Sequence, residues 1–204
     1  MATVSFKSIK ELILQVLPED RFSLGLIYDA VNRSIRTLSS EGGLNDLMPE
    51  TKETMTVSAL GVYALSGLTY QHLKTERVVD PSGNECLRIG REAFKTGFTA
   101  DADLRYAQES GSIYVDPASE ALDYEIVYRS FLPKFTAFGA TGAGTTISIN
   151  KYFIPAIKNL TIANLAQAKN YGIANKIPQT YQDKYLKNLD KLKAIAAGKK
   201  EEEL

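Results

Sequence analysis

The sequence has very few of the reactive side chains on which many active sites depend. Its 204 residues include one cysteine, one histidine and no tryptophan. The single cysteine, Cys86, excludes a disulfide within the chain and suits a protein made in a reducing cytoplasm. Because His72 is the only histidine, a zinc site built on two histidines is excluded as well.

The chain also lacks a net charge and a long apolar run. Lys plus Arg number 24 and Asp plus Glu number 24, so the electrostatic signature of a nucleic-acid or membrane-surface binder is missing, although local patches remain possible. No segment approaches the roughly 18 apolar residues of a membrane span. Lys7, Lys10 and Glu11 interrupt the apolar residues at the N-terminus, unlike the core of a signal peptide. We therefore expect a soluble protein with no membrane partner.

Two helical patterns open the chain. Ser8 and Glu11 fit a capping box, which predicts a short helix that ends by Pro18. A second helix is expected to begin near Ser23 and to stop at Gly42-Gly43. The apolar positions expected on its inner face are Leu24, Ile27, Val31, Ile35 and Leu38.

After Pro49, β-branched and aromatic residues in alternation replace the helical period. The clearest hairpin covers residues 105–116 and turns at Glu109-Ser-Gly-Ser112. The other expected strands cover residues 51–58, 63–65, 70–79, 85–89 and 123–131. In the last of these, alternation places three side chains on one face, namely Tyr124, Ile126 and Tyr128.

Helical periodicity returns in the last quarter of the chain. Helices are predicted within residues 150–172 and 178–197, with Pro155 near the start of the first. The order is therefore helices, then strands, then helices. Such segregation favours an α+β protein with an antiparallel sheet over a doubly wound one, whose strands would alternate with helices.

The segment FGATGAGTT, residues 138–146, resembles a phosphate-binding loop at first sight. Its glycines, Gly139, Gly142 and Gly144, miss the dinucleotide-binding spacing, and no Lys-Ser or Lys-Thr follows them as in a Walker loop. The preferred interpretation is a flexible loop or linker. A nucleotide-binding enzyme that uses residues 139–146 is kept as an alternative.

The remaining reactive side chains favour structural roles. Cys86 lies beside Leu87 and Ile89, so we interpret it as a small buried apolar residue, and a catalytic thiol would need His72 close by. The loop carboxylates lack the spacing of a calcium loop. The sequence therefore predicts no catalytic, cofactor-binding or metal-binding residue, and hence no enzyme.

Four features, taken in order, resemble the head-to-tail adaptor proteins of tailed bacteriophages. The chain opens with SIKELILQVL followed by IYDAVNRSIRTL, continues with TKETMTVSALGVYAL, and then carries the pair RYAQESGSIYVDPA and LDYEIVYRSFLP. A pair of long helices then ends in the charged extension KKEEEL. The likeness spans nearly the whole chain, and the order of the motifs carries it.

The resemblance implies a structural role in the virion neck. Adaptors form a ring, typically of twelve copies, beneath the portal, join the capsid to the tail and let DNA pass without sequence-specific binding. The implied partners are the portal protein, further copies of the chain, and downstream tail or nozzle proteins. The protein would be made in the host cytoplasm. The residues expected to bind the portal are Lys199, Lys200, Glu201, Glu202, Glu203 and Leu204. Another tail-completion or baseplate protein is the structural alternative.

The predicted fold class combines the element order with this resemblance. We expect an α+β protein, a helical bundle of about four main helices with an inserted antiparallel β-sheet or hairpin region. Residues 1–198 would form a single adaptor domain and residues 199–204 a C-terminal tail. Within that domain we expect helices in 8–42, the β-rich insertion in 50–131, the glycine-rich linker in 138–146 and helices in 150–197.

Overall fold

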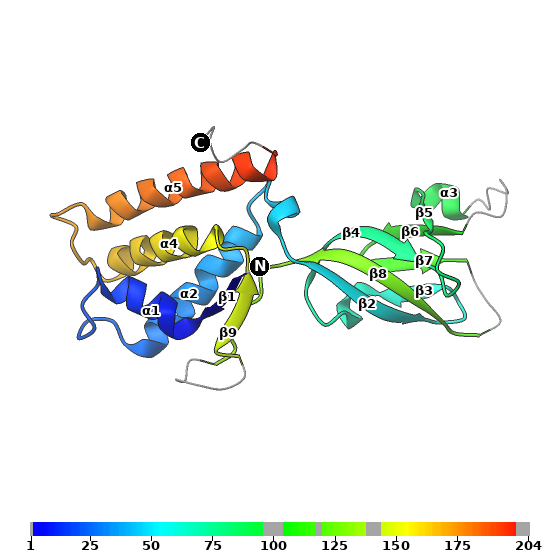
Figure 1. The fold of residues 1–204 in the computed structure, drawn as a ribbon, viewed down its shortest axis with the longest axis horizontal. Helices are drawn as coiled ribbons and strands as arrows, with labels where there is room; N and C mark the ends of the chain where they lie inside the picture. Colours follow the sequence, from blue (N-terminus) through cyan, green and yellow to red (C-terminus); the bar gives the residue numbers. More distant parts are fainter. Residues whose placement is uncertain (1, 96–103, 117–119, 138–143, 199–204) are drawn as a thin grey trace. The chain divides into compact units, whose positions relative to one another are not determined.

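The computed structural model describes residues 2–95, 104–116, 120–137 and 144–198. The chain forms two compact units (Figure 1). The helical unit combines Met1–Pro49 with Phe131–Leu204, and the β-rich unit consists of Glu50–Ser130. The helical unit is therefore assembled from two stretches of sequence that the β-rich unit separates.

Four helices, a 3-10 turn and a two-stranded sheet make up the described part of the helical unit. The elements are β1 (Ala2–Ser5), α1 (Phe6–Leu14), α2 (Leu24–Ser39), η1 (Asn45–Leu47), β9 (Thr146–Ile149), α4 (Phe153–Ala168) and α5 (Ile177–Ala196). Strand β1 pairs antiparallel with β9, so that Ala2 lies opposite Ile149 and Ser5 opposite Thr146. None of the helices in the described ranges combines the length and apolar character needed to cross a bilayer.

The N-terminal helices begin at serine caps. The Ser23 hydroxyl accepts a hydrogen bond from the Leu26 amide, which confirms the predicted start of α2. The cap of α1 is Ser5, whose hydroxyl accepts from the Ser8 amide at 3.0 Å, so the predicted capping box at Ser8 is wrong. Ser5 is the N-cap in place of Ser8 because β1 ends at Ser5 with extended backbone, the conformation that an N-cap needs.

Helix α4 is the central element of the helical unit. It contacts α5, α2 and α1, and its buried residues lie nearly all round the helix. Pro155 lies in its first turn, where a missing amide hydrogen costs no internal hydrogen bond. On α2, Ile27, Val31, Ile35 and Leu38 are buried as predicted, whereas Leu24 is 39% exposed and its predicted inward position is wrong.

Residues 131–137, which we call the returning segment, bring the chain back from the β-rich unit onto α2. The Phe135 carbonyl accepts hydrogen bonds from the Tyr28 hydroxyl at 2.6 Å and the Asn32 side-chain amide at 2.9 Å. The Phe135 amide donates to the Asn32 side-chain oxygen at 2.9 Å. Further along α2, the buried Ser39 hydroxyl accepts from the Leu132 amide at 3.1 Å. These polar contacts fix a segment that has no helix or strand of its own.

Two sheets form the β-rich unit. One has the order β2-β8-β4, from β2 (Glu50–Val57), β8 (Leu122–Ser130) and β4 (His72–Val79). The other has the order β3-β7-β6-β5, from β3 (Val62–Ala64), β7 (Ser112–Val115), β6 (Arg105–Glu109) and β5 (Leu87–Arg88). A 3-10 turn, η2 (Leu65–Gly67), follows β3, and a short helix, α3 (Arg91–Lys95), follows β5.

One buried cluster joins the two sheets. It includes Tyr124, Ile126 and Tyr128 of β8, which confirms the predicted common face of that strand. The predicted hairpin is confirmed as β6 and β7, which pair antiparallel. Its turn residues Ser110 and Gly111 have φ angles of 50° and 78°, the positive values that a two-residue hairpin turn of this kind requires.

The predicted fold class is wrong in its architecture. Instead of about four helices with one inserted antiparallel sheet or hairpin, the described residues hold five α-helices and nine strands in three sheets. One sheet, β1 with β9, belongs to the helical unit, and β5 pairs parallel with β6. The two strands of the extra sheet are four residues long and far apart in the sequence, so neither gives a distinct strand signal.

The central position of α4 generates a stability prediction. Replacing fully buried Ile157 by alanine should lower the free energy of unfolding by about 2–5 kcal/mol, because it removes apolar contacts and leaves a cavity. Leu186→Ala on α5, where the leucine is 46% exposed, should change it by about 0.5 kcal/mol or less. Urea unfolding followed by far-ultraviolet circular dichroism measures both, and equal effects would contradict the packing described for α4.

Candidate functional site

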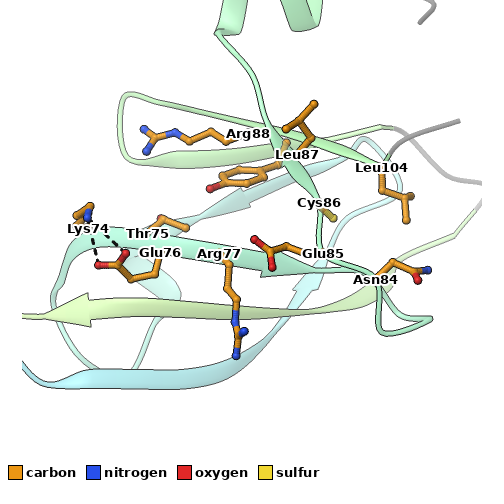
Figure 2. Close-up of a pocket in the computed structure, with 11 residues that line it drawn as sticks. Lys74, Thr75, Glu76, Arg77, Asn84, Glu85, Cys86, Leu87, Arg88 and Leu104 are labelled. Carbon is orange, nitrogen blue, oxygen red and sulfur yellow. Dashed lines mark hydrogen bonds and ion pairs between the residues drawn. The ribbon is translucent and has the colours of Figure 1, made fainter. Parts of the chain in front are cut away.

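A groove with a volume of about 750 Å³ opens on the β-rich unit between β4 and β5 (Figure 2). It will be called the edge groove. Residues Lys74–Arg77 of β4 lie along one side and Leu87 and Arg88 of β5 along the other, while residues 84–86 cross between them. The groove therefore lies where an outer strand of one sheet faces an outer strand of the other.

Both strands present unpaired edges to this groove. Strand β4 pairs with β8, and on its other side the Cys86 amide donates to the Val78 carbonyl at 2.8 Å. In the described part of the chain no strand covers the β4 edge nearer its start. Among the described strands, β5 pairs with β6 alone. Unpaired strand edges offer backbone donors and acceptors to another chain.

The charges along the groove are only partly compensated. The Lys74 ammonium lies 3.3 Å from a carboxylate oxygen of Glu76. Within the described residues, Arg77, Arg88 and Glu85 form no ion pair, and Leu87, which precedes Arg88 on β5, is 57% exposed. The groove thus combines two free guanidinium groups, one free carboxylate and an exposed apolar side chain.

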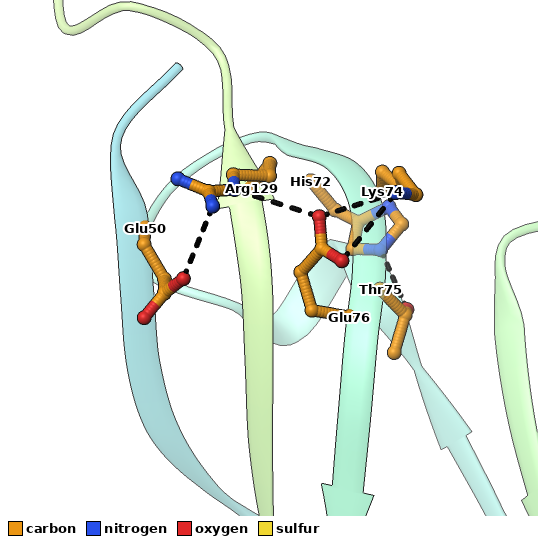
Figure 3. A network of polar contacts seen from close by, with 6 residues as sticks. All are labelled: Glu50, His72, Lys74, Thr75, Glu76 and Arg129. Atoms are coloured by element: carbon orange, nitrogen blue, oxygen red, sulfur yellow. Dashed lines mark hydrogen bonds and ion pairs between the residues drawn. The ribbon is translucent and has the colours of Figure 1, made fainter. Parts of the chain in front are cut away.

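A polar network secures the start of β4 to the middle strand of its sheet (Figure 3). Arg129 of β8 bridges two carboxylates, at 3.2 Å from Glu50 and 3.4 Å from Glu76. Since Glu50 and Arg129 are also paired in register, the chain enters and leaves the β-rich unit through neighbouring strands. The network therefore ties together the two ends of this unit.

His72 serves the packing of this sheet. Its ring stacks on Tyr128 with 5.7 Å between centroids, and its Nε2 lies 2.8 Å from the Thr75 hydroxyl. Burial, and secondarily the positive charge of Arg88, lowers the pKa of His72 below its ordinary value. The ring is therefore neutral at physiological pH and engaged by its neighbours.

Glu53 and Tyr128 form a second polar pair on the same sheet. The Tyr128 hydroxyl donates to one carboxylate oxygen of Glu53, and the Thr69 amide donates to the other at 2.9 Å. Burial alone would raise the pKa of Glu53, but hydrogen bonds from Tyr128 and Thr69 together hold it below its ordinary value. Burial and the bond to Glu53 raise the pKa of Tyr128. The pair is thus a carboxylate held by neutral donors.

Cys86 lines the edge groove but is poorly suited to nucleophilic chemistry. Burial, followed by the negative charges of Asp80, Glu85 and Asp116, raises the pKa of its thiol to about 11. His72 is not among the residues that line the groove beside it. Across the described ranges, no group of three or more histidine, cysteine, aspartate or glutamate side chains is placed to hold a metal ion.

The glycine-rich segment is described at its edges. Gly139 and Gly142 lie outside the described residues, whereas the Gly144 carbonyl accepts hydrogen bonds from the Thr136 and Ala137 amides at 3.0 and 3.2 Å. Gly144 has a φ angle of 82° and leads into β9. A strand, not the helix of a nucleotide-binding loop, therefore follows the glycines. The predicted portal-binding residues 199–204 also lie outside the described residues.

Sequence reasoning missed the edge groove. Lys74, Arg77 and Arg88 give no motif, and their grouping depends on a parallel pairing of β5 with β6 that local patterns do not encode. One local signal does exist, since Asp80-Pro-Ser-Gly-Asn84, just before the strand expected over residues 85–89, has the composition of a turn that brings the chain back toward β4. That signal predicted a return strand but not its change of sheet.

Removing the Tyr128 hydroxyl should raise the pKa of Glu53. Tyr128→Phe deletes one donor while burial remains, so the carboxylate is favoured less. Because the native pKa of Glu53 is lowered, its contribution to stability is present at neutral pH and lost as the pH falls below the ordinary range. The variant should therefore be less stable by about 1–2 kcal/mol at pH 7, with a smaller difference in acid.

Carbon-detected NMR titration of the Glu53 carboxyl measures this shift. Tyr124→Phe is the matched control, since Tyr124 is buried on the same strand and its hydroxyl forms no hydrogen bond within the described residues. An unchanged Glu53 pKa in Tyr128→Phe would contradict the described pair.

The Cys86 thiol should react slowly with alkylating reagents. With a pKa of about 11, its thiolate fraction at pH 8 is about 100-fold smaller than that of an ordinary thiol, and the rate should rise steeply toward pH 11. Alkylation quenched at successive times and followed by mass spectrometry measures this rate. The same chain unfolded in denaturant supplies the reference. Equal rates in the folded and unfolded chain would contradict the burial of Cys86.

Comparison with known proteins leaves the family undecided. No protein-family model matches this chain, and no curated protein matches its sequence. The resemblance to phage adaptors therefore stays a prediction that rests on the motifs and their order.

Proposed function

We propose that this protein is a noncatalytic connector subunit of a bacteriophage neck. Copies would form a ring beneath the portal, join the capsid to the tail and let the genome pass. The order of the sequence motifs suggests the family, and the unpaired strand edges of the edge groove are the observation that carries the assembly role. On this proposal the protein resides in the virion after synthesis in the host cytoplasm.

Ring assembly places a definite demand on each subunit. A closed ring with rotational symmetry uses head-to-tail contacts, so two different surfaces of one subunit meet complementary surfaces of its neighbours. The edge groove has the properties of one such surface. A segment of the next copy could pair with the free edges of β4 and β5, cover Leu87 and neutralise Arg77, Arg88 and Glu85.

Contact with the portal is assigned to the end of the chain. Helix α5 carries an exposed face of charged and polar residues and ends at Ala196, a short distance before residues 199–204. That tail contains two lysines, three glutamates and a terminal leucine. The proposal places the portal at this tail, further copies at the edge groove and tail or nozzle proteins downstream, with twelve copies as the expected ring size.

The direct test mixes the purified chain with the portal protein of the same virus and images the mixture by electron microscopy. We expect ring-shaped complexes in which the chain is bound to the portal. Deletion of residues 199–204 should abolish portal binding without changing the circular dichroism spectrum. Persistent absence of a complex with the complete chain would contradict the connector role, and binding to a tail or baseplate protein instead would favour another tail component.

A pair of leucine variants tests the edge groove as the contact between copies. Leu87→Glu should reduce ring formation more than about tenfold, because it replaces an apolar side chain that the next copy would cover with a carboxylate that would have to lose its water there. Leu60→Glu is the control, since Leu60 is 81% exposed in the same unit and does not line the groove. Equal ring formation by the two variants would remove the groove from the proposal.

A further inference from the structure

A second groove, with a volume of about 470 Å³, lies in the helical unit between α2 and the returning segment. It will be called the basic groove. Arg33 and Arg36 line it from α2, and Lys134 lines it from the returning segment. The two arginines are three residues apart on one helix and therefore neighbours on its surface. The groove brings together cations that are about a hundred positions apart in the sequence.

These cations are not neutralised by the described part of the chain. Within that part, Arg33, Arg36 and Lys134 form no ion pair, and all three are exposed. Asp29 is the one carboxylate among the described residues that line the groove, so three cations face a single negative charge there. A chain with no net charge thus carries a local positive surface.

The Tyr28 hydroxyl and the Asn32 side-chain amide of the groove are already occupied. Both ends of the Asn32 amide and the Tyr28 hydroxyl are hydrogen-bonded to the Phe135 backbone. The Phe135 ring is buried and packs edge-on against Phe6, with 5.6 Å between centroids. The bonds to Phe135 also fix its neighbours Lys134 and Thr136, and the two arginines and the lysine are the cations that the groove presents to a ligand.

The nature of these groups selects the ligand. Guanidinium groups bind phosphates and carboxylates through paired hydrogen bonds, and lysine adds a point charge. An acidic peptide would also need a pocket for an apolar anchor, yet the apolar ring at this groove is buried. A small enclosed ligand would not leave three cations exposed. An extended chain of phosphates fits the groove best.

We propose that the basic groove binds the phosphodiester backbone of nucleic acid. Recognition would be independent of base sequence, because the Asn32 amide and the Tyr28 hydroxyl are engaged with the Phe135 backbone and the three cations would neutralise phosphates. This inference rests on the basic groove alone and stands whether or not the chain is a connector.

The test measures binding of the complete chain to a short labelled duplex DNA by fluorescence polarisation as salt is raised. Three phosphate contacts predict a slope of about −2.7 for the logarithm of affinity against the logarithm of salt concentration. The triple variant Arg33→Gln, Arg36→Gln and Lys134→Gln should bind at least about tenfold more weakly in low salt, with a slope near zero. Two duplexes of different sequence should bind equally well.

A second triple variant separates the groove from general charge. Lys184→Gln, Lys187→Gln and Lys191→Gln remove three exposed cations from α5 and should leave both affinity and slope nearly unchanged. Asp29→Asn should strengthen binding because it removes the opposing carboxylate. Circular dichroism verifies that each variant is folded.

Several outcomes would overturn the inference. These are no binding by the unmodified chain, an equal loss in the two triple variants, a preference for one DNA sequence, and displacement of DNA by polyglutamate at matched charge concentration. The last result would identify the groove as a site for acidic peptides.

Discussion

The helical unit depends on how the chain is held where it returns from the β-rich unit. Its core contains residues that precede the β-rich unit in the sequence and residues that follow it. Residues 131–137, where the chain returns, form no strand or helix that would secure them. The polar face of α2 does so instead, because Asn32 and Tyr28 satisfy the Phe135 backbone and Ser39 satisfies the Leu132 amide. The anchored segment lets Phe135 fill the core and fixes Lys134 beside the arginines of α2.

Sequence patterns correctly predicted the features that depend only on residues close together in the chain. The serine cap of α2, the Ser110-Gly111 turn and the buried face of β8 each follow from a few neighbouring residues. The architecture depended on pairings between distant residues and was predicted wrongly. Strand β9 is secured by pairing with β1, in which Ala2 lies opposite Ile149, and because β1 ends at Ser5, helix α1 is capped there and not at Ser8. Periodicity carries no information about such partners.

Sequence patterns did not predict the two grooves, for a related reason. Arg33 and Arg36 look like the solvated face of an amphipathic helix, and nothing in their neighbourhood indicates that Lys134 joins them. Balanced charge over the chain argued against a nucleic-acid binder, yet charge averages over a whole chain do not report a local surface. The edge groove likewise arises because the chain changes sheet after Val79, at a turn whose residues fix its shape but not its destination.

Amide hydrogen exchange in the returning segment tests most directly whether α2 anchors residues 131–137. Segments without regular structure ordinarily exchange their amides quickly, whereas amides bonded to buried or anchored side chains are protected. If α2 anchors this segment, the Leu132 and Phe135 amides exchange about as slowly as those of α4. Exchange of both amides at the rate of an exposed loop, while α4 stays protected, would contradict the account.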